Sequence, residues 1–144
     1  MRFNLFEVKM ISQQEQYKAL VEALLPEDLF RYFEIIEVKF SDKSIDVYLD
    51  ELNNPPSSHK HVKLVSKGFH SAVSIQDFPI RKRAVFLHVR RRKWKEEHTG
   101  KIISNSWDTT AKGTRYTKDF ASFLKGLFGQ LPDQQQQPGE ILPH

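Results

Sequence analysis

The sequence of 144 residues contains no cysteine, which excludes disulfide bonds and every zinc site built on thiolates. It also lacks a run of about 18 apolar residues, the length that a helix needs to cross a membrane, so we expect no membrane partner. Residues 1–11 begin like a weak signal peptide, but Glu7 and Lys9 interrupt the apolar run and no small-residue cleavage site follows. These absences favour a cytoplasmic protein.

The motifs that mark common enzyme classes are also missing. The chain has no P-loop, no G-x-S-x-G and no H-E-x-x-H, and its Asp residues are scattered without the spacing of a two-metal site. We therefore expect no catalytic residues and no cofactor. His59, His61 and His98 would bind zinc only if two separate loops met, and we interpret them as exposed loop histidines without metal.

Acidic residues are absent from residues 78–95, where eight Lys or Arg accumulate. The rest of the charge is also unevenly divided: residues 1–58 carry a net charge of −5, residues 59–129 carry +11 and residues 130–144 carry −2. A basic half joined to an acidic half indicates a polyanionic partner, with nucleic acid ahead of a membrane surface.

The basic stretch has the pattern of a strand that starts in the core and ends in solvent. A Phe78-Pro79 turn and a basic triplet precede residues 84–89, which alternate as an apolar strand. Beyond them, guanidinium groups fall on both faces of the strand, where they could bind phosphates through paired hydrogen bonds. Trp94 could stack on a base or pack beneath the Arg side chains. Such a ribbon can enter a DNA groove or follow the DNA backbone.

A second basic group precedes the last predicted helix, where backbone N–H groups at a helix N-terminus can bind a phosphate. Ordinary helix capping with surface charge explains the same pattern equally well. Together the two groups supply the candidate DNA-binding residues, which are Arg81, Lys82, Arg83, Arg90, Arg91, Arg92, Lys93, Trp94, Lys95, Lys112, Arg115 and Lys118.

Apolar spacing predicts helices at both ends of the chain. Apolar side chains recur at i, i+3, i+4, i+7 and i+8 within residues 12–25 and again within residues 117–128. Ser12 and Thr117 are suitable N-caps for these two helices, and Pro26 is suited to begin a short helix after the first.

Between the helices, alternating apolar residues predict short strands. Residues 34–40 and 44–52 form one predicted hairpin, and residues 62–66 and 72–76 flank a Lys-Gly turn. The basic strand then runs to a hairpin tip at 96–100. The sum is an α+β fold with N-terminal helices, a small antiparallel β region and one C-terminal helix.

Composition divides the chain into three parts. Residues 1–33 form an N-terminal helical segment, and residues 34–129 form an α+β DNA-binding domain. Residues 130–144 are rich in Gln and poor in apolar residues, so we expect a disordered tail or linker there.

Three segments occur in an informative order: Asp-Phe-Pro at 77–79, Arg-Arg-Arg at 90–92 and Thr-Arg-Tyr-Thr-Lys at 114–118. Over about residues 30–128, this order resembles the N-terminal region of bacterial insertion-sequence transposases. In those proteins an Asp-Leu-Pro turn, an Arg-rich strand end and an Arg/Thr-rich helix follow one another.

The chain departs from that group because it lacks the two cysteine pairs of the group's zinc ribbon, whose places fall near residues 54–61 and 96–101. The resemblance implies zinc-ribbon-like hairpins without metal, held by aromatic packing. It also implies binding to double-stranded DNA at transposon ends, a location at the bacterial nucleoid, and a DDE catalytic domain on a partner subunit or on a downstream part of the same product.

Two other interpretations remain open at the level of sequence. The basic hairpin could dock an acidic protein partner, including the acidic half of a second copy in a homo-oligomer. The exposed aromatic residues could instead bind RNA. Preference for one DNA sequence separates DNA recognition from the first interpretation, and competition between single-stranded RNA and duplex DNA separates it from the second.

Overall fold

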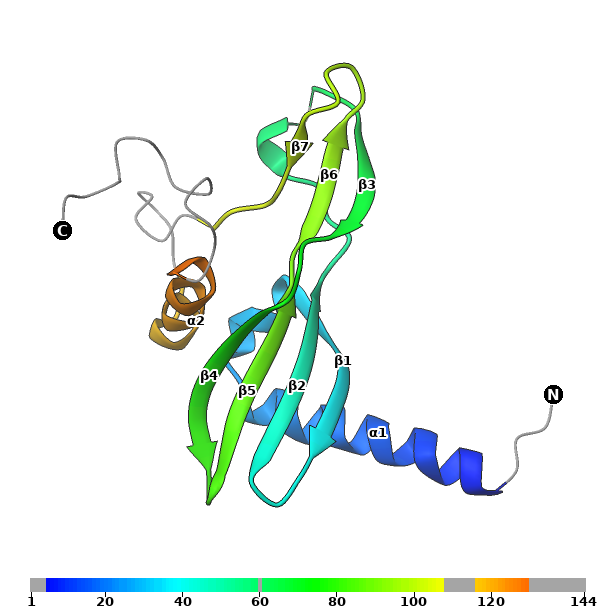
Figure 1. Ribbon diagram of the computed structural model, residues 1–144, viewed down its shortest axis with the longest axis vertical. Helices are drawn as coiled ribbons and strands as arrows, with labels where there is room; N and C mark the ends of the chain where they lie inside the picture. The colour runs from blue at the N-terminus through cyan, green and yellow to red at the C-terminus, as the bar shows by residue number, and fades with distance from the viewer. Residues whose placement is uncertain (1–4, 60, 108–115, 130–144) are drawn as a thin grey trace.

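The computed structural model describes residues 5–59, 61–107 and 116–129, with side chains described from Gln13 onward. The elements follow in this order: α1 (Leu5–Leu24), η1 (Glu27–Arg31), β1 (Phe33–Phe40), β2 (Ser44–Glu51), η2 (Ser57–His59), β3 (Leu64–Phe69), β4 (Val73–Ile80), β5 (Arg83–Arg90), β6 (Arg92–Glu96), β7 (Ile102–Ile103) and α2 (Lys118–Gly129). The predicted α+β class, with an N-terminal helix, a β region and a C-terminal helix, is confirmed (Figure 1).

The larger sheet contains four strands in the order β1-β2-β5-β4. Two antiparallel hairpins, β1–β2 and β4–β5, lie side by side through the parallel pairing of β2 with β5. In this register Tyr48 lies opposite His88, and Asp50 lies opposite Arg90. Alternation in the sequence does not indicate this parallel pairing, because it marks a strand without identifying its neighbour.

The main hydrophobic core of the described residues lies between the larger sheet and both α-helices. Along β2, Ile45, Val47 and Leu49 are buried, whereas Asp46 and Tyr48 on the other face are partly exposed. The helical segments contribute these buried side chains: Val21, Leu25, Leu29, Phe120, Phe123, Leu124 and Leu127. Because residues from both predicted parts, 1–33 and 34–129, contribute to this core, the two parts pack as one unit.

The smaller sheet contains β3, β6 and β7 in the order β3-β6-β7. The same two chain segments pass through both sheets: β3 leads into β4, and β5 leads through Arg91 into β6. The molecule is therefore elongated along these strands. The β1–β2 and β4–β5 turns lie at one end and the β6–β7 tip lies at the other (Figure 1).

Strand β1 is an edge strand, and the side chain of Gln14 in α1 covers part of its free edge. The Gln14 amide donates to the Val38 carbonyl oxygen at 3.3 Å, and its oxygen accepts from the Val38 N–H at 3.4 Å. These two bonds imitate a neighbouring strand at one residue, which makes the edge less available for pairing with another chain.

Helix boundaries differ from the sequence prediction at the N-terminal end. The first helix begins at Leu5 rather than at Ser12, because no Pro or Gly precedes Ser12 to stop the helix. The short segment after Pro26 forms the 3-10 helix η1 instead of an α-helix. Among the described residues, no helix is both long enough and apolar enough to cross a membrane.

Two predicted turns lie within strands instead. Lys67-Gly68 lies inside β3, where Gly68 has a φ of 83° and the pairing with β6 shifts between Ser66 and Phe69. Phe78-Pro79 similarly lies at the end of β4, and the tight turn follows at Arg81-Lys82. In both cases the turn-forming residues produce a β-bulge rather than a chain reversal. Residues 130–144, where a tail was predicted, lie outside the described residues.

Candidate nucleic-acid interface

The basic stretch 78–95 does not form one patch, because it runs along the whole length of the molecule. It includes the end of β4, the following turn, β5 and most of β6. From Arg83 to Lys95 an extended chain covers about 40 Å, at about 3.3 Å per residue. The candidate residues therefore fall into three places: a turn, a junction between the sheets, and the smaller sheet.

At the turn, Arg81, Lys82 and Arg83 are all exposed, and none of them makes an ion pair with any described residue. Two hydrogen bonds connect the neighbouring β1–β2 turn to this part of the chain. Arg83 Nε donates to the Ser41 carbonyl oxygen at 3.0 Å, and the Ala84 N–H donates to the Lys43 carbonyl oxygen at 2.9 Å. These bonds bring the exposed Lys43 and Asp42 of that turn beside the triplet, so among the described residues this end of the larger sheet carries four cations without an ion pair and one carboxylate.

The turn also contains a backbone conformation that is unusual for its residue type. Arg81 has a φ of 59°, in the left-handed region that favours glycine. A residue held in that region raises the energy of the folded state by about 1 kcal/mol or more, and such strain is found repeatedly at functional sites.

The junction between the sheets contains Arg90, whose charge is neutralised by the acidic N-terminal half. Arg90 donates two hydrogen bonds to the Asp50 carboxylate, both at 2.6 Å, in the paired geometry that guanidinium groups favour. This bonding raises the pKa of Arg90. Asp50 is positioned for the contact by the parallel register of β2 and β5.

Glu51, the next residue in β2, is buried at the same junction. Its carboxylate accepts hydrogen bonds from the Arg92 N–H at 3.2 Å and from Asn105 Nδ2 at 2.8 Å. Arg92 Nε in turn donates to the Glu51 carbonyl oxygen at 2.8 Å. Burial raises the pKa of Glu51, and the bonds from Asn105 and Arg92 and the charge of Arg91 partly offset that rise.

Arg91 points to the opposite side from Arg90 and Arg92, and only 3% of its surface is exposed. It donates to the Asn105 carbonyl oxygen at 2.6 Å, and its guanidinium lies 5.1 Å from the ring centre of Phe128 in α2. Burial lowers the pKa of Arg91, and the charge of Glu51 partly offsets this effect. Arg91 thus joins the last helix to the junction.

Arg90 and Arg92 also share an aromatic partner in β3. Their guanidinium carbons lie 4.2 Å and 4.7 Å from the ring centre of Phe69, within the range of cation–π attraction. All three junction arginines therefore already have partners within the protein. The guanidinium groups lie on both sides of the chain, as the alternation predicts, but each is bound within the protein, and Arg90 keeps 47% of its side chain exposed.

In the smaller sheet, Trp94 is buried opposite Ser66 and Ile103. Of its two predicted roles, stacking on a base requires an exposed ring, so the burial supports the packing role. Lys93 and Lys95 are partly exposed and make no ion pair with any described residue. These two lysines form a second available basic group, at the other end of the molecule from the turn.

Helix α2 provides fewer groups for phosphate binding at its N-terminus than the sequence indicates. Thr117 is its N-cap, with Oγ1 accepting from the Phe120 N–H at 3.1 Å, as predicted. The Thr117 N–H, however, donates to the carboxylate of buried Asp28 at 2.9 Å, so an acidic side chain already occupies the place where a phosphate was considered. Lys118 is exposed, whereas Lys112 and Arg115 lie outside the described residues.

The structure also shows a polar network that the sequence did not indicate, on the outer face of the larger sheet. His88 lies between Ser74, with 2.8 Å from Nδ1 to Oγ, and Asp46, with 2.7 Å from Nε2 to Oδ1. In serine hydrolases Nε2 faces the serine and Nδ1 faces the aspartate, so the orientation here is reversed. In the sequence this network is visible only as polar residues at alternate positions of β2 and β5. These residues can be related to one another only when the pairing of β2 with β5 is known.

Metal binding gains no support from the described residues, in which no group of three or more His, Cys, Asp or Glu side chains is placed to hold an ion. His61 and His98 are exposed, and His59 Nδ1 bonds with Ser58 Oγ at 2.9 Å.

No protein-family model, no curated protein and no solved structure matches this chain.

Proposed function

We propose that this protein is a non-catalytic DNA-binding region of an insertion-sequence transposase that recognises transposon ends. The catalytic DDE domain would then lie on a partner subunit or on a downstream part of the same product. The order of the sequence segments supports the transposase assignment. The exposed, unpaired cations of the β4–β5 turn support DNA binding, and this observation carries the proposal.

The turn is well suited to bind a phosphate backbone. Its three cations lie on a hairpin whose base is fixed in the larger sheet, so binding orders their side chains but requires little further ordering of the backbone. The available lysines of β6 lie about 40 Å away along the strands. That separation is close to one turn of B-DNA, about 34–36 Å, so one duplex could contact both basic groups on the same side.

The contact residues of this proposal are fewer than the sequence indicated. Arg81, Lys82 and Arg83 bind the backbone at one end, and Lys93 and Lys95 bind it at the other. Arg90, Arg91, Arg92 and Trp94 hold the two sheets and the last helix together, and act on DNA only by positioning those ends.

The test is a binding titration with two duplexes, one that carries the terminal inverted repeat of the element and one with the same bases shuffled. We expect tighter binding of the repeat, and a preference that persists at higher salt.

Replacing Arg81, Lys82 and Arg83 with alanine should weaken binding to both duplexes. It should also reduce the slope of log K against log salt by about 3, because each lost phosphate contact removes about 0.9.

A matched control removes the same charge elsewhere, by replacing Lys18, Arg31 and Lys125 with alanine. If this control weakens binding as much as the turn variant, net charge rather than the turn is responsible and the proposed contact is wrong. If the wild-type protein binds both duplexes equally, DNA binding stands and recognition of transposon ends does not.

A further inference from the structure

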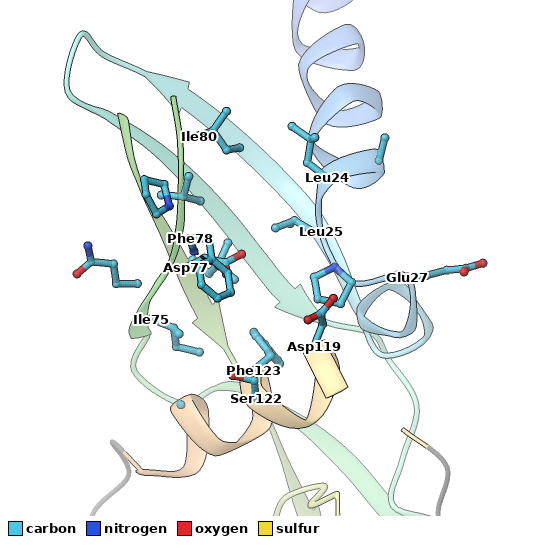
Figure 2. Close-up of a pocket in the computed structure, with 17 residues that line it drawn as sticks. Leu24, Leu25, Glu27, Ile75, Asp77, Phe78, Ile80, Asp119, Ser122 and Phe123 are labelled. Atoms are coloured by element: carbon cyan, nitrogen blue, oxygen red, sulfur yellow. Dashed lines mark hydrogen bonds between the residues drawn. The ribbon is translucent and has the colours of Figure 1, made fainter. Parts of the chain in front are cut away.

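An open apolar groove lies between the end of α1, strand β4 and helix α2, on the side of the larger sheet that faces the helices (Figure 2). Its volume is about 620 Å³, and apolar side chains from all three elements line it, among them Leu24, Leu25, Ile75, Phe78, Ile80 and Phe123. A hollow of this size is large enough for several side chains of a partner.

The residues around the groove are more exposed than their apolar character favours. Phe78 is 81% exposed and Leu24 is 54% exposed, and Leu20, one turn earlier in α1, is 58% exposed. Such a concentration of large apolar side chains at one place on a surface is typical of a contact site for another protein.

The charges that line the groove itself disfavour DNA as its occupant, although the basic turn 81–83 follows directly after Ile80. Asp77 and Asp119 line it, Glu27 lies at its edge with the carboxylate directed away from it (Figure 2), and no Lys or Arg lines it. The Asp77 carboxylate accepts a hydrogen bond from the Phe78 N–H at 2.8 Å, whereas Glu27 and Asp119 are exposed and make no ion pair with any described residue. A polyanion would be repelled here, and a basic partner would be attracted.

The shape of β4 indicates that the partner is a helix rather than an added strand. Strand β4 lies at the edge of the sheet, so a strand could in principle pair with it. Beside the groove, however, the register shifts between Asp77 and Ile80, and Pro79 has no N–H to donate. These two features prevent a regular ladder of hydrogen bonds, whereas a helix that lies in the groove needs none.

The helices of a second copy do not fit this description. Helix α1 contains three Glu against two Lys, so it is not basic. Helix α2 carries its apolar side chains Phe120, Phe123, Leu124 and Leu127 in the core. We propose that the groove binds a basic amphipathic helix of a different protein, with apolar side chains against Phe78 and Leu24 and with Lys or Arg near Glu27 and Asp119.

The test uses the full chain and two labelled synthetic helical peptides, followed by fluorescence anisotropy. Both peptides carry leucine at i, i+3, i+4 and i+7, and they differ only in having lysine or glutamate at the flanking positions. We expect saturable binding of the lysine peptide and at least about tenfold weaker binding of the glutamate peptide. Replacing Glu27 with Gln and Asp119 with Asn should reduce this difference.

Phe78→Ser should weaken binding of the lysine peptide at least about tenfold. The matched control is Ile36→Ser, because Ile36 is also a large exposed apolar residue (45%) but does not line the groove. Leu24→Ser provides a second groove variant in case Phe78→Ser alters folding, which thermal denaturation would show.

Three results would overturn the inference: equal binding of both peptides, no binding of the lysine peptide, or unchanged binding by both groove variants. Self-association of the wild type that Phe78→Ser abolishes would also overturn it, because the occupant would then be a second copy. The alanine variant of Arg81, Lys82 and Arg83 should bind the lysine peptide at least as tightly as the wild type, because it removes cations next to Ile80 that repel a basic peptide. Loss of DNA binding and failure of this inference are therefore distinguishable.

Discussion

Arg90, Arg91 and Arg92 follow one another in sequence, yet each meets a different environment. Strand alternation places Arg91 on the opposite side from its two neighbours, against Phe128 and Asn105. Arg90 pairs with Asp50, and Arg92 binds Glu51. The same side chain therefore serves to neutralise an acid, to bond a backbone carbonyl oxygen and to cover a ring, and residue type alone does not reveal which.

Arg91→Ala should lower the free energy of unfolding by about 2 kcal/mol, because it removes one of the two positive charges near buried Glu51, the bond to the Asn105 carbonyl oxygen and the contact with Phe128. Urea denaturation measures this change. Lys93→Ala, two residues away at a partly exposed position without an ion pair, should change the same quantity by less than about 0.5 kcal/mol. Similar effects of the two substitutions would contradict the structural role of Arg91.

At the scale of elements, the β4–β5 hairpin combines backbone strain with three exposed cations that make no ion pair with any described residue. Local patterning predicts its strand β5, because alternating apolar residues determine which face is buried. It does not predict the turn, since Phe78-Pro79 is the stronger turn signal by composition and instead forms a bulge within β4. The turn moves to Arg81-Lys82, where the ladder of β4 and β5 ends.

Arg81→Gly should raise the free energy of unfolding by about 0.5 kcal/mol, because glycine relieves a left-handed conformation at some entropic cost. The same substitution should weaken DNA binding, since it removes a cation of the turn. Chemical denaturation and a DNA titration on one protein sample measure both effects. Lys82→Gly is the control: with no strain to relieve, it should lower both stability and DNA affinity.

At the scale of the whole molecule, both sheets depend on continuous strands. The segments β3–β4 and β5–β6 pass from one sheet to the other, and the bonds of Glu51 and Arg91 lie where they cross. Strand β7 of the smaller sheet has only two residues, so this sheet is little more than the β3–β6 pair, and an isolated pair of strands is marginally stable. Its stability therefore depends on the larger sheet and on the core beneath it.

We expect both sheets to unfold in one transition. Trp94 is buried in the smaller sheet, and Trp107 packs 5.4 Å from Phe33 and 6.1 Å from Phe128 in ring-centre distance, next to the main core. The variants Trp94→Phe and Trp107→Phe each leave one reporter. In both, the midpoint of tryptophan fluorescence in urea should coincide with that of far-UV circular dichroism. An earlier fluorescence transition in Trp107→Phe would show that the smaller sheet unfolds by itself.

The sequence predicts the elements of this molecule better than their arrangement. Periodicity locates both helices and most strands, because burial of one face leaves a local trace. It predicts neither the parallel neighbours β2 and β5 nor the neutralisation of Arg90 by Asp50, which are contacts between residues 40 positions apart. The sequence therefore identified the basic stretch 78–95, but the division of that stretch into available and internally bound cations required the three-dimensional structure.

The parallel register of β2 and β5 has a consequence for how this protein can change over evolutionary time. It couples Asp46 to His88 and Asp50 to Arg90, so a substitution on one strand leaves a charge without its partner on the other. In descendants of this sequence, both members of each pair should be retained or replaced together. Turn residues Arg81 and Lys82 have no such partner among the described residues, so their replacement leaves no buried or paired charge behind, and at Arg81 the left-handed backbone is the remaining structural constraint.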